Sequence, residues 1–301
     1  MSADSYEGLF KRLDALIDRV EGLLPRAAQA PDWDASIAFR WRKHQDRALL
    51  QPVAHPHRMR LEDLRGIDRQ KDLVESNTRQ FVARKPANNV LLTGARGTGK
   101  SSLVKGALNR FAPDGLRLIE VDKHDLIDLP DIADLVAARP ERFIVFCDDL
   151  SFEASEAAYK ALKAVLDGSI AAPPENLLIY ATSNRRHLMP EFMHENLEYK
   201  HVGEEIHPGE GLEEKISLSE RFGLWVSFYP FDQDHYLDIV AHWLAQFGCP
   251  PTEEARAEAL RWALSRGSRS GRVAWQFARD WAGKKGKGAA AGRRHGTTGR
   301  R

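Results

Sequence analysis

The chain has 301 residues, of which 43% are hydrophobic and 29% are charged, so it is long enough for one large or two modest domains. Its mean hydropathy of −0.46 and the lack of a long apolar run argue against a membrane-spanning segment. The start, MSADSYEGLFKRLD, lacks the features of a signal peptide. The two cysteines, Cys147 and Cys249, argue against a disulfide scaffold or a zinc site and favour a reducing, cytoplasmic location.

The net charge of +1 is unevenly distributed along the chain. The tail at 284–301, KKGKGAAAGRRHGTTGRR, contains seven Lys or Arg and no acid, and removing these seven charges leaves −6 for the remainder. The body therefore gives no support to a generally basic, nucleic-acid-binding surface. The tail is predicted to be a solvated, disordered end, and its binding to nucleic acid or to an acidic partner at low salt is the alternative.

Residues 1–60 are predicted to form a helical and extended N-terminal extension. Apolar residues from Leu9 to Leu24 recur at helical spacing and end at Pro25, which predicts an amphipathic helix. Residues 33–47 mix aromatic and basic side chains, as single-strand nucleic-acid binders do. The alternative for this second segment is an extension that packs on the following domain.

Strands alternate with helices between residues 89 and 230. Apolar runs predict strands at 89–93, 116–121, 143–147, 177–181 and 225–228, and helical patterns occupy 100–111, 126–139 and 155–166. Because these strands are apolar throughout, we expect a parallel sheet with helices on both faces. Three further helices are predicted at 234–247, 252–266 and 271–281. The sequence therefore predicts an α/β domain followed by a small helical domain.

The turn between the first of these strands and the first helix matches the phosphate-binding pattern G-x-x-x-x-G-K-[ST]. The glycines let backbone N–H groups turn towards phosphate oxygens, and the following helix directs its N-terminal dipole at the same anion. Lys100 is expected to reach the β- and γ-phosphates of ATP, and Ser101 to ligate Mg²⁺. The alternative is an ordinary Gly-rich turn. The predicted nucleotide-binding residues here are Gly94, Ala95, Arg96, Gly97, Thr98, Gly99, Lys100, Ser101 and Ser102.

Two carboxylates follow the buried strand at 143–147. In phosphate-loop enzymes an acid at the end of another buried strand completes the Mg²⁺ shell, and Asp148 lies where that acid is expected. Asp149 is expected to point elsewhere, because successive strand positions face opposite sides, and to orient or deprotonate the attacking water. The alternative is that both aspartates only cap the next segment.

Three further polar residues are candidates for the same site. Asn184, in LLIYATSNRRHL, follows a strand and is expected near the γ-phosphate and the water, with an Asx turn as the alternative. Arg221, in LSERFGLW, precedes the last strand, and a surface charge or local salt bridge is its alternative role. Arg272, in SRSGRVAWQF, begins a helix, where the helix dipole disfavours an arginine that has no ligand.

The order of these motifs resembles that of an AAA+ ATPase, and more closely that of a bacterial family of uncharacterised AAA+ type proteins. The similarity is carried by GARGTGKSS, FCDDLSF, ATSNRRHL and SERFGLW, and it extends over about residues 61–281. The resemblance implies a P-loop sheet in the order 5-1-4-3-2 with a C-terminal helical lid. It places the nucleotide-binding core at 61–230, the lid at 231–283 and the basic tail at 284–301.

The resemblance also implies a role for each motif residue. ATP and Mg²⁺ are the implied cofactors, and a homo-oligomeric ring or filament is implied because an arginine finger acts on the ATP of a neighbouring subunit. By position, Lys100 and Ser101 match the Walker A pair, Asp148 matches the Walker B aspartate, and Asp149 matches the catalytic acid. Asn184 matches sensor 1, Arg221 the arginine finger and Arg272 the sensor 2 arginine. Gly66 and Ile67 match the segment that cradles adenine.

We therefore expect a cytoplasmic ATPase that uses hydrolysis to drive a conformational change on a protein or nucleic-acid client. The alternative is a slow-turnover switch or loader. Most AAA+ enzymes have Glu where this chain has Asp149, and the shorter side chain sets the carboxylate on the order of 1.5 Å farther back. A misplacement of about 1 Å can cost about a hundredfold in rate.

A small-molecule kinase is disfavoured, because it has no use for Arg221, Arg272 and a separate lid.

Overall fold

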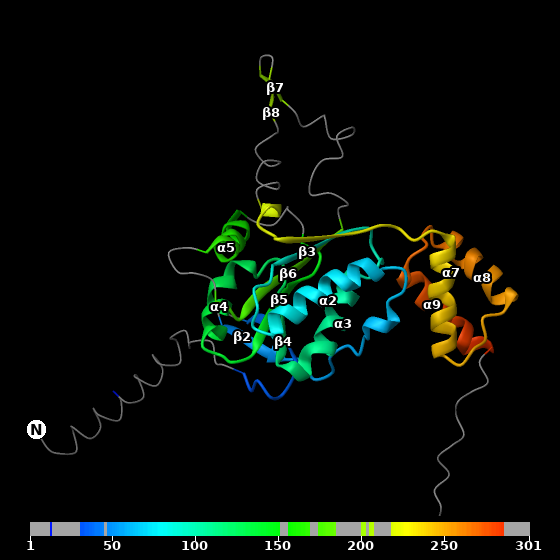
Figure 1. Ribbon diagram of the computed structural model, residues 1–301, viewed down its shortest axis with the longest axis horizontal. Helices are drawn as coiled ribbons and strands as arrows, with labels where there is room; N and C mark the ends of the chain where they lie inside the picture. The colour runs from blue at the N-terminus through cyan, green and yellow to red at the C-terminus, as the bar shows by residue number, and fades with distance from the viewer. Residues whose placement is uncertain are drawn as a thin grey trace, which may run out of the picture.

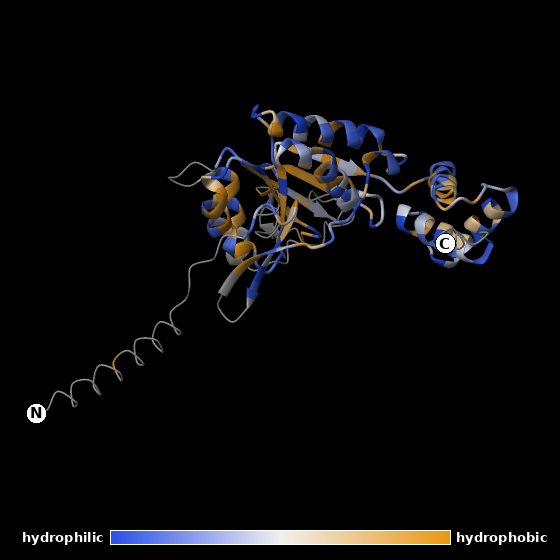
Figure 2. Cartoon of the chain, turned by 90° about the horizontal axis from the view of Figure 1, so that it is seen from below, coloured by the Kyte–Doolittle hydropathy of each residue, from blue (hydrophilic) through white to orange (hydrophobic). Residues whose placement is uncertain are grey.

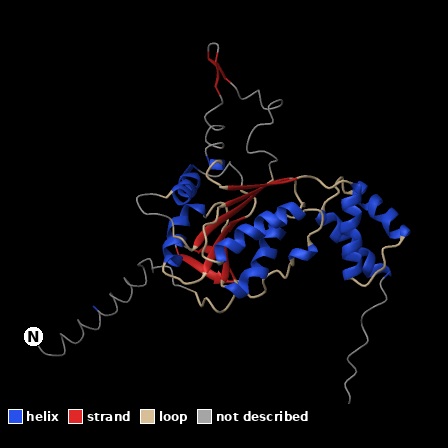
Figure 3. Cartoon of the chain, viewed as in Figure 1, coloured by secondary structure: helices blue, strands red, loops and turns tan. Residues whose placement is uncertain are grey.

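The computed structural model describes residues 13, 31–44, 47–150, 156–168, 174–184, 200–202, 205–207 and 218–285. The predicted N-terminal helix and nearly all of the basic tail lie outside this part. A central sheet is covered by helices on both faces, and a group of three helices follows beside it (Figures 1 and 3). None of the described helices is both long and apolar enough to cross a membrane.

The five predicted strands form the parallel centre of the sheet. Each pairs in parallel with its neighbours, and their spatial order, β9-β3-β6-β5-β4, is the predicted 5-1-4-3-2. The mostly parallel α/β fold is thus confirmed. The strands are β3 (Val90–Gly94), β4 (Leu116–Glu120), β5 (Arg142–Cys147), β6 (Leu177–Ser183) and β9 (Leu224–Phe228).

The strand order of the whole sheet differs from the prediction, because two more strands extend it beyond β4. They are β1 (Ala38–His44), which is parallel to β4, and β2 (Arg47–Pro52), which is antiparallel to β1. Both strands come from the segment that we assigned to an N-terminal extension. In the structure these residues are part of the core sheet.

Burial of the aromatic residues in this segment decides between its two interpretations. Phe39 and Trp41 are at most 1% exposed, Trp33 is 6% exposed, and the Trp41 indole donates to Asp128 Oδ2 at 3.0 Å. Rings that lie inside a core cannot stack on nucleic-acid bases. The segment is therefore packed on the sheet, as the second of the two interpretations expected, and these three aromatics do not form a base-stacking surface.

Each face of the sheet has its own pair of helices. One apolar cluster joins the sheet to α2 (Asp68–Val82) and α3 (Lys100–Phe111), and the other joins it to α4 (Leu129–Ala137) and α5 (Glu156–Asp167). Successive residues of β5 alternate between the two clusters, as strand geometry requires. Figure 2 shows the apolar residues gathered between the sheet and the helices, with polar outer surfaces.

Short 3-10 turns extend or precede three of these helices. They are η1 (Leu61–Asp63), η2 (Ala112–Asp114) and η3 (Leu126–Asp128). The helix predicted at 126–139 is thus η3 followed by α4, with a proline in the first turn of α4.

A separate antiparallel pair, β7 (Lys200–Val202) and β8 (Glu205–His207), lies between β6 and β9 in the sequence.

The three C-terminal helices, here called the lid, have an apolar cluster of their own. They are α7 (Gln233–Gln246), α8 (Glu253–Ser265) and α9 (Gly271–Lys285). The side chains of Asp232 and Thr252 accept hydrogen bonds from backbone N–H groups in the first turns of α7 and α8, which stabilises both helix starts. The chain enters the lid directly from β9, on the side where the phosphate loop lies (Figure 1).

Candidate functional site

The phosphate loop (residues 94–101) follows β3 and leads directly into α3. Its three glycines, Gly94, Gly97 and Gly99, have φ angles of +127°, +76° and +104°, which residues with a side chain rarely adopt. A Cβ on Gly94 would lie 2.0 Å from the carbonyl oxygen of Phe228. The glycines are therefore needed for the shape of the loop, and the start of α3 presents its positive dipole end there.

Lys100 is buried at the centre of this loop. Its ammonium donates to the carbonyl oxygens of Gly94 at 2.6 Å and Ala95 at 2.8 Å. Burial lowers the pKa of Lys100 to about 8, although the carboxylates of Asp148 and Asp149 act in the opposite direction. A cation held this way at a helix start is suited to bind a phosphate group.

The two predicted acids lie in the turn after β5. Ser101 Oγ donates to Asp148 Oδ1 at 2.6 Å, so the two residues predicted to hold Mg²⁺ are in contact. Asp149 has a φ of +57° and its carboxylate takes a different direction. Strand alternation is the wrong explanation for this divergence, because β5 ends at Cys147. A left-handed backbone turn separates the two carboxylates instead.

Asn184 connects Asp149 to Lys100. Its Nδ2 donates to Asp149 Oδ1, and its Oδ1 accepts from Lys100 Nζ at 3.2 Å. The side chain therefore bridges two other segments of the chain, which a local Asx turn would not require. Arg96 Nη2 lies 3.9 Å from Asp149 Oδ2, and both side chains are more than half exposed, so this ion pair contributes little to stability.

Thr182, which belongs to none of the motif positions named above, contacts both acids. Its hydroxyl donates to Asp148 Oδ1 at 2.6 Å and accepts from the Asp149 backbone N–H at 2.9 Å. Thr182 lies within the motif ATSN, two residues before Asn184. The polar end of an otherwise apolar strand was the available signal for it.

The oxygen ligands at this site fit Mg²⁺. A hydroxyl from Ser101 and a carboxylate from Asp148 are the hard ligands that Mg²⁺ takes, and in nucleotide sites phosphate oxygens and water complete the shell. In the part of the chain that the structure describes, no group of three or more His, Cys, Asp or Glu residues is arranged to hold a metal ion. Ser101 and Asp148 would be the protein ligands of such an ion, and phosphate oxygens and water would supply the others.

The lid contacts the phosphate loop directly. The backbone N–H of Gly271, the first residue of α9, donates to the Gly97 carbonyl at 2.8 Å. A Cβ on Gly97 would lie 2.8 Å from the Ser270 side chain and 3.6 Å from Arg272 Cβ. The positive charge of Arg272 also contributes to the lowered pKa of Lys100. The structure thus brings the predicted sensor 2 residue close to the loop.

Gly66 and Ile67 lie where the core meets the lid. Gly66 has a φ of +71°, and a Cβ there would lie 3.2 Å from the rings of Phe231 and His235. Ile67 is buried, and its Cδ1 would lie 3.4 Å from a Cβ on Gly99. The segment predicted to cradle adenine is therefore next to both the phosphate loop and the start of the lid.

Arg221 is not part of this group of residues. Its Nε lies 2.5 Å from Asp167 Oδ2 at the end of α5. Leu224, three residues after it, pairs with Val90 at the start of β3, whereas the phosphate loop begins at the end of β3. The length of that strand, roughly 15 Å, therefore separates Arg221 from the loop of the same chain.

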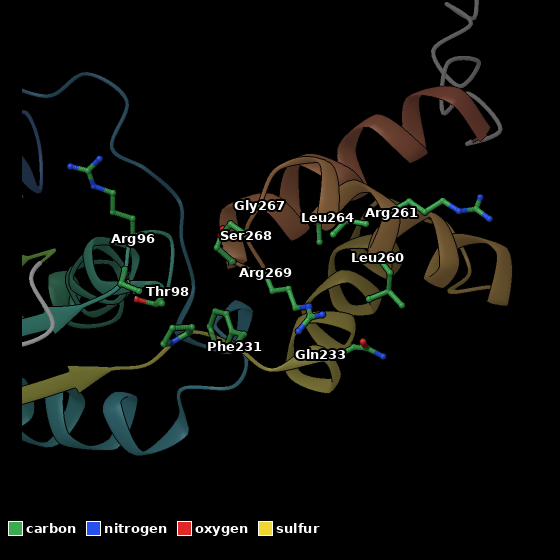
Figure 4. Close-up of a pocket in the computed structure, with 14 residues that line it drawn as sticks. Arg96, Thr98, Phe231, Gln233, Leu260, Arg261, Leu264, Gly267, Ser268 and Arg269 are labelled. Atoms are coloured by element: carbon green, nitrogen blue, oxygen red, sulfur yellow. Dashed lines mark hydrogen bonds between the residues drawn. The ribbon is translucent and has the colours of Figure 1, made fainter.

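A cavity of about 740 Å³ lies between the phosphate loop and the lid (Figure 4). Arg96 and Thr98 line it from the loop, and Phe231, Leu264 and Arg269 are among the residues that line it from the lid side. Its size is that of a small-molecule site, but Lys100, Ser101 and Asp148 do not line it. The hydrogen-bonded groups at the ends of β5 and β6, and not this cavity, identify the candidate phosphate and metal site.

Cys147 is the last residue of β5 and directly precedes Asp148. It is 1% exposed, and burial, followed by the nearby carboxylates, raises its pKa to about 12. A neutral thiol of this kind is chemically inert. Cys147 therefore acts as a small apolar core residue beside the site.

Comparison with solved structures identifies the fold. A point mutant of RuvB from Thermotoga maritima superposes with a TM-score of 0.52 at 13% identity, over 75% of this chain and 66% of that chain. A second point mutant of the same protein superposes with a TM-score of 0.52 at 15% identity, over 75% of this chain and 67% of that chain. The chain thus spans about two thirds of the length of these RuvB structures, and at such identities the likeness shows the fold alone.

Comparison of the sequences identifies the family. No curated protein matches the chain. The model of the family DUF815, described as a protein of unknown function, matches residues 34–285, which include β1, β2 and the whole lid. The chain belongs to the DUF815 family, and its fold is that of the AAA+ P-loop ATPases.

Proposed function

We propose that this protein binds Mg·ATP at the phosphate loop and hydrolyses it to ADP and phosphate, to drive a conformational change on a macromolecular client. The main support is the single hydrogen-bonded group around the loop. In it, Asn184 joins Lys100 to Asp149, and Asp148 bonds to Ser101. A lysine, a metal-binding pair and a second carboxylate are the parts that phosphoryl transfer to water requires.

Each side chain has a defined task in this proposal. Lys100 binds the β- and γ-phosphate oxygens and stabilises the charge that develops on them. Ser101 and Asp148 hold Mg²⁺, which when bound neutralises phosphate charge. Asp149 accepts a hydrogen bond from the attacking water and takes up its proton, and Asn184 orients both the water and the Asp149 carboxylate. The ribose and adenine lie towards Gly66 and Ile67.

The proposal includes a homo-oligomer, either a ring or a filament. Arg221 lies near the end of the sheet away from the phosphate loop of its own chain, so an arginine finger at this position acts on the ATP of a neighbouring subunit. Arg272, at the start of α9, interacts with the bound phosphates and transmits their presence to the lid. The cysteine usage favours a cytoplasmic location.

A slow ATP-dependent switch that loads or holds a protein or nucleic-acid client is the second candidate. It is favoured by the geometry of Asp149, which has the short side chain and whose carboxylate is already bonded to Asn184. Steady-state turnover, measured with and without single-stranded DNA, separates the two candidates. Fast turnover that needs no partner contradicts the switch, and slow turnover that single-stranded DNA stimulates supports it.

Substitutions at the loop and at the second acid test the proposed ATPase. Lys100→Ala is expected to abolish saturable binding of a fluorescent ATP analogue, whereas Lys105→Ala, a control on the same helix, is expected to retain it. Asp149→Asn is expected to bind ATP as the wild type does and to lose about 10²-fold or more in turnover, because it removes the proton acceptor. Unchanged binding by Lys100→Ala would refute the proposed site.

The Asp149→Asn protein also serves to identify the client. A variant that binds ATP without hydrolysing it is expected to remain in the ATP-bound form and to hold its partner. Affinity purification in ATP, with Lys100→Ala as the matched control that cannot bind ATP, is expected to enrich the client only with Asp149→Asn.

A further inference from the structure

Thr182 lies at the point where β5 and β6 stop pairing as strands. The β5–β6 ladder ends at the pair Cys147 and Ala181. Beyond it, the Thr182 carbonyl accepts from the Leu150 N–H at 2.7 Å, and its hydroxyl accepts from the Asp149 N–H at 2.9 Å. Thr182 is 2% exposed. One buried residue thus holds both ends of the turn that contains Asp149.

The direction of each hydrogen bond at the Thr182 hydroxyl follows from its partners. A backbone N–H can only donate, so the hydroxyl oxygen is the acceptor towards Asp149. The single hydroxyl proton is then donated to Asp148 Oδ1, at 2.6 Å. Thr182 therefore contacts the side chain of one acid and the backbone of the other through a single oxygen atom.

The backbone of Asp149 needs such support. Its φ of +57° lies in the left-handed region, which residues with a side chain seldom adopt and which persists only when the surroundings hold it. The two hydrogen bonds that Thr182 accepts, from the N–H groups of Asp149 and Leu150, lie on either side of this residue. They fix the turn in the form that brings the Asp149 carboxylate to Asn184.

The carboxylate of Asp148 is held from two sides. Its Oδ1 accepts from both Thr182 and Ser101, each at 2.6 Å. Because Oδ1 already accepts from these two hydroxyls, Oδ2 would be the oxygen available to hold a metal ion or its bound water. Partners behind metal ligands typically change metal affinity or activity by about 10- to 100-fold when they are removed.

We propose that Thr182 is a positioning residue for both acids of the site, the metal-side Asp148 and the water-side Asp149. This inference rests on the proposed ATPase function and adds to it a residue that touches neither the nucleotide nor the reacting water. Thr182 acts through the orientation of Asp148 and through the backbone conformation of Asp149.

Replacing the hydroxyl alone tests this role. Thr182→Val keeps the shape of the side chain and removes the hydroxyl, whereas Thr182→Ser keeps the hydroxyl and removes a methyl group. Thr182→Val is expected to raise the Mg²⁺ concentration for half-maximal activity, and to lower turnover, by about 10- to 100-fold. ATP binding measured in EDTA is expected to stay at the wild-type level, and Thr182→Ser to stay near wild type in every measurement.

The measurements separate a failure of this inference from a failure of the proposed function. If the wild type neither binds nor hydrolyses ATP, the proposed function is wrong and Thr182 loses its role with it. If the wild type binds ATP without measurable turnover, the Mg²⁺ dependence of ATP binding tests Thr182 alone. If the wild type is active and Thr182→Val shows the same Mg²⁺ dependence and turnover, only the role of Thr182 is overturned.

A second pair of variants guards against misfolding. If Thr182→Val does not fold, Thr182→Ala and Thr182→Ser are compared instead, since these differ by the hydroxyl oxygen alone. Equal Mg²⁺ dependence in these two variants contradicts the proposal, and a shift confined to Thr182→Ala supports it. Circular dichroism and thermal unfolding establish that each variant is folded.

Discussion

Lys100 is an ionisable residue whose environment leads to a prediction about pH. Its pKa is lowered from the ordinary lysine value to about 8, chiefly by burial. A phosphate group binds the protonated form, so ATP binding above that pH must include the uptake of a proton. ATP affinity is therefore expected to fall as the pH rises above about 8, and by up to tenfold for each further pH unit.

The dissociation constant of a fluorescent ATP analogue, measured from pH 7 to 9.5, checks this prediction. Lys100→Arg is the matched control, because a guanidinium remains protonated throughout this range. Its affinity, whatever its absolute value, is expected to be independent of pH. A wild-type affinity that stays constant to pH 9.5 would show that the ammonium keeps its proton in the free protein.

The identities of the site residues were more predictable than their geometry. Lys100, Ser101 and Asp148 belong to local patterns whose spacing is set by the chemistry, and the structure brings them together. The orientation of Asp149 depends on a left-handed turn, and that turn depends on a hydrogen bond that the Asp149 N–H donates to Thr182, 33 residues away. A long-range contact of this kind leaves no periodic signal in the sequence.

The contact between the phosphate loop and α9 leads to a prediction at the scale of elements. Gly97→Ala places a Cβ 2.8 Å from the Ser270 side chain, at a φ of +76°. The left-handed backbone alone costs about 1–2 kcal/mol for a residue with a side chain, and the close approach adds to it. We expect Gly97→Ala to weaken ATP binding and to loosen the lid.

Gly115→Ala is the matched control for this substitution. Gly115 also has a positive φ, +89°, but a Cβ there meets nothing within 4 Å. The Gly115→Ala protein should therefore lose stability only through its strained backbone. Its ATP affinity should match that of the wild type, and the amide hydrogens of α9 should still exchange slowly. Equal effects of the two substitutions would mean that the contact between loop and lid is not important for binding.

Among the elements that the sequence did not reveal are β1 and β2, the two strands that extend the sheet beyond β4. The run from Phe39 to Lys43 alternates aromatic and basic residues, which fits a strand with one buried face. It also fits a nucleic-acid-binding segment, and the alternation is short. The choice between a strand and a nucleic-acid-binding segment depends on the pairing of β1 with β4, which begins about 75 residues later. By contrast, α3 begins and ends as predicted, because the loop motif and its apolar periodicity are both local.

The position of Arg221 leads to a prediction for the whole molecule. An ATP site completed by a neighbouring subunit needs Lys100 from one chain and Arg221 from another. Arg221→Ala and Lys100→Ala proteins are each expected to be inactive alone. When the two are mixed, some sites combine an intact Lys100 with an intact Arg221, and part of the ATPase activity should return.

Turnover measured across mixing ratios gives the result directly. Activity is expected to be highest near equal amounts of the two variants. A mixture of Lys100→Ala with Asp149→Asn serves as the control, since both changes affect the same half of the site and no complete site can form. If the first mixture is also inactive although the subunits exchange, Arg221 does not act between subunits.

The burial of both cysteines has a practical consequence for following the lid. Cys147 and Cys249 are both enclosed in the fold, and the high pKa of Cys147 keeps its thiol protonated at the pH of labelling reactions. Maleimide dyes should therefore leave the native protein largely unmodified. A cysteine introduced on the exposed surface of α8 and another on α2 can then carry a fluorophore pair, so that the distance between lid and core is observable in single molecules during nucleotide turnover.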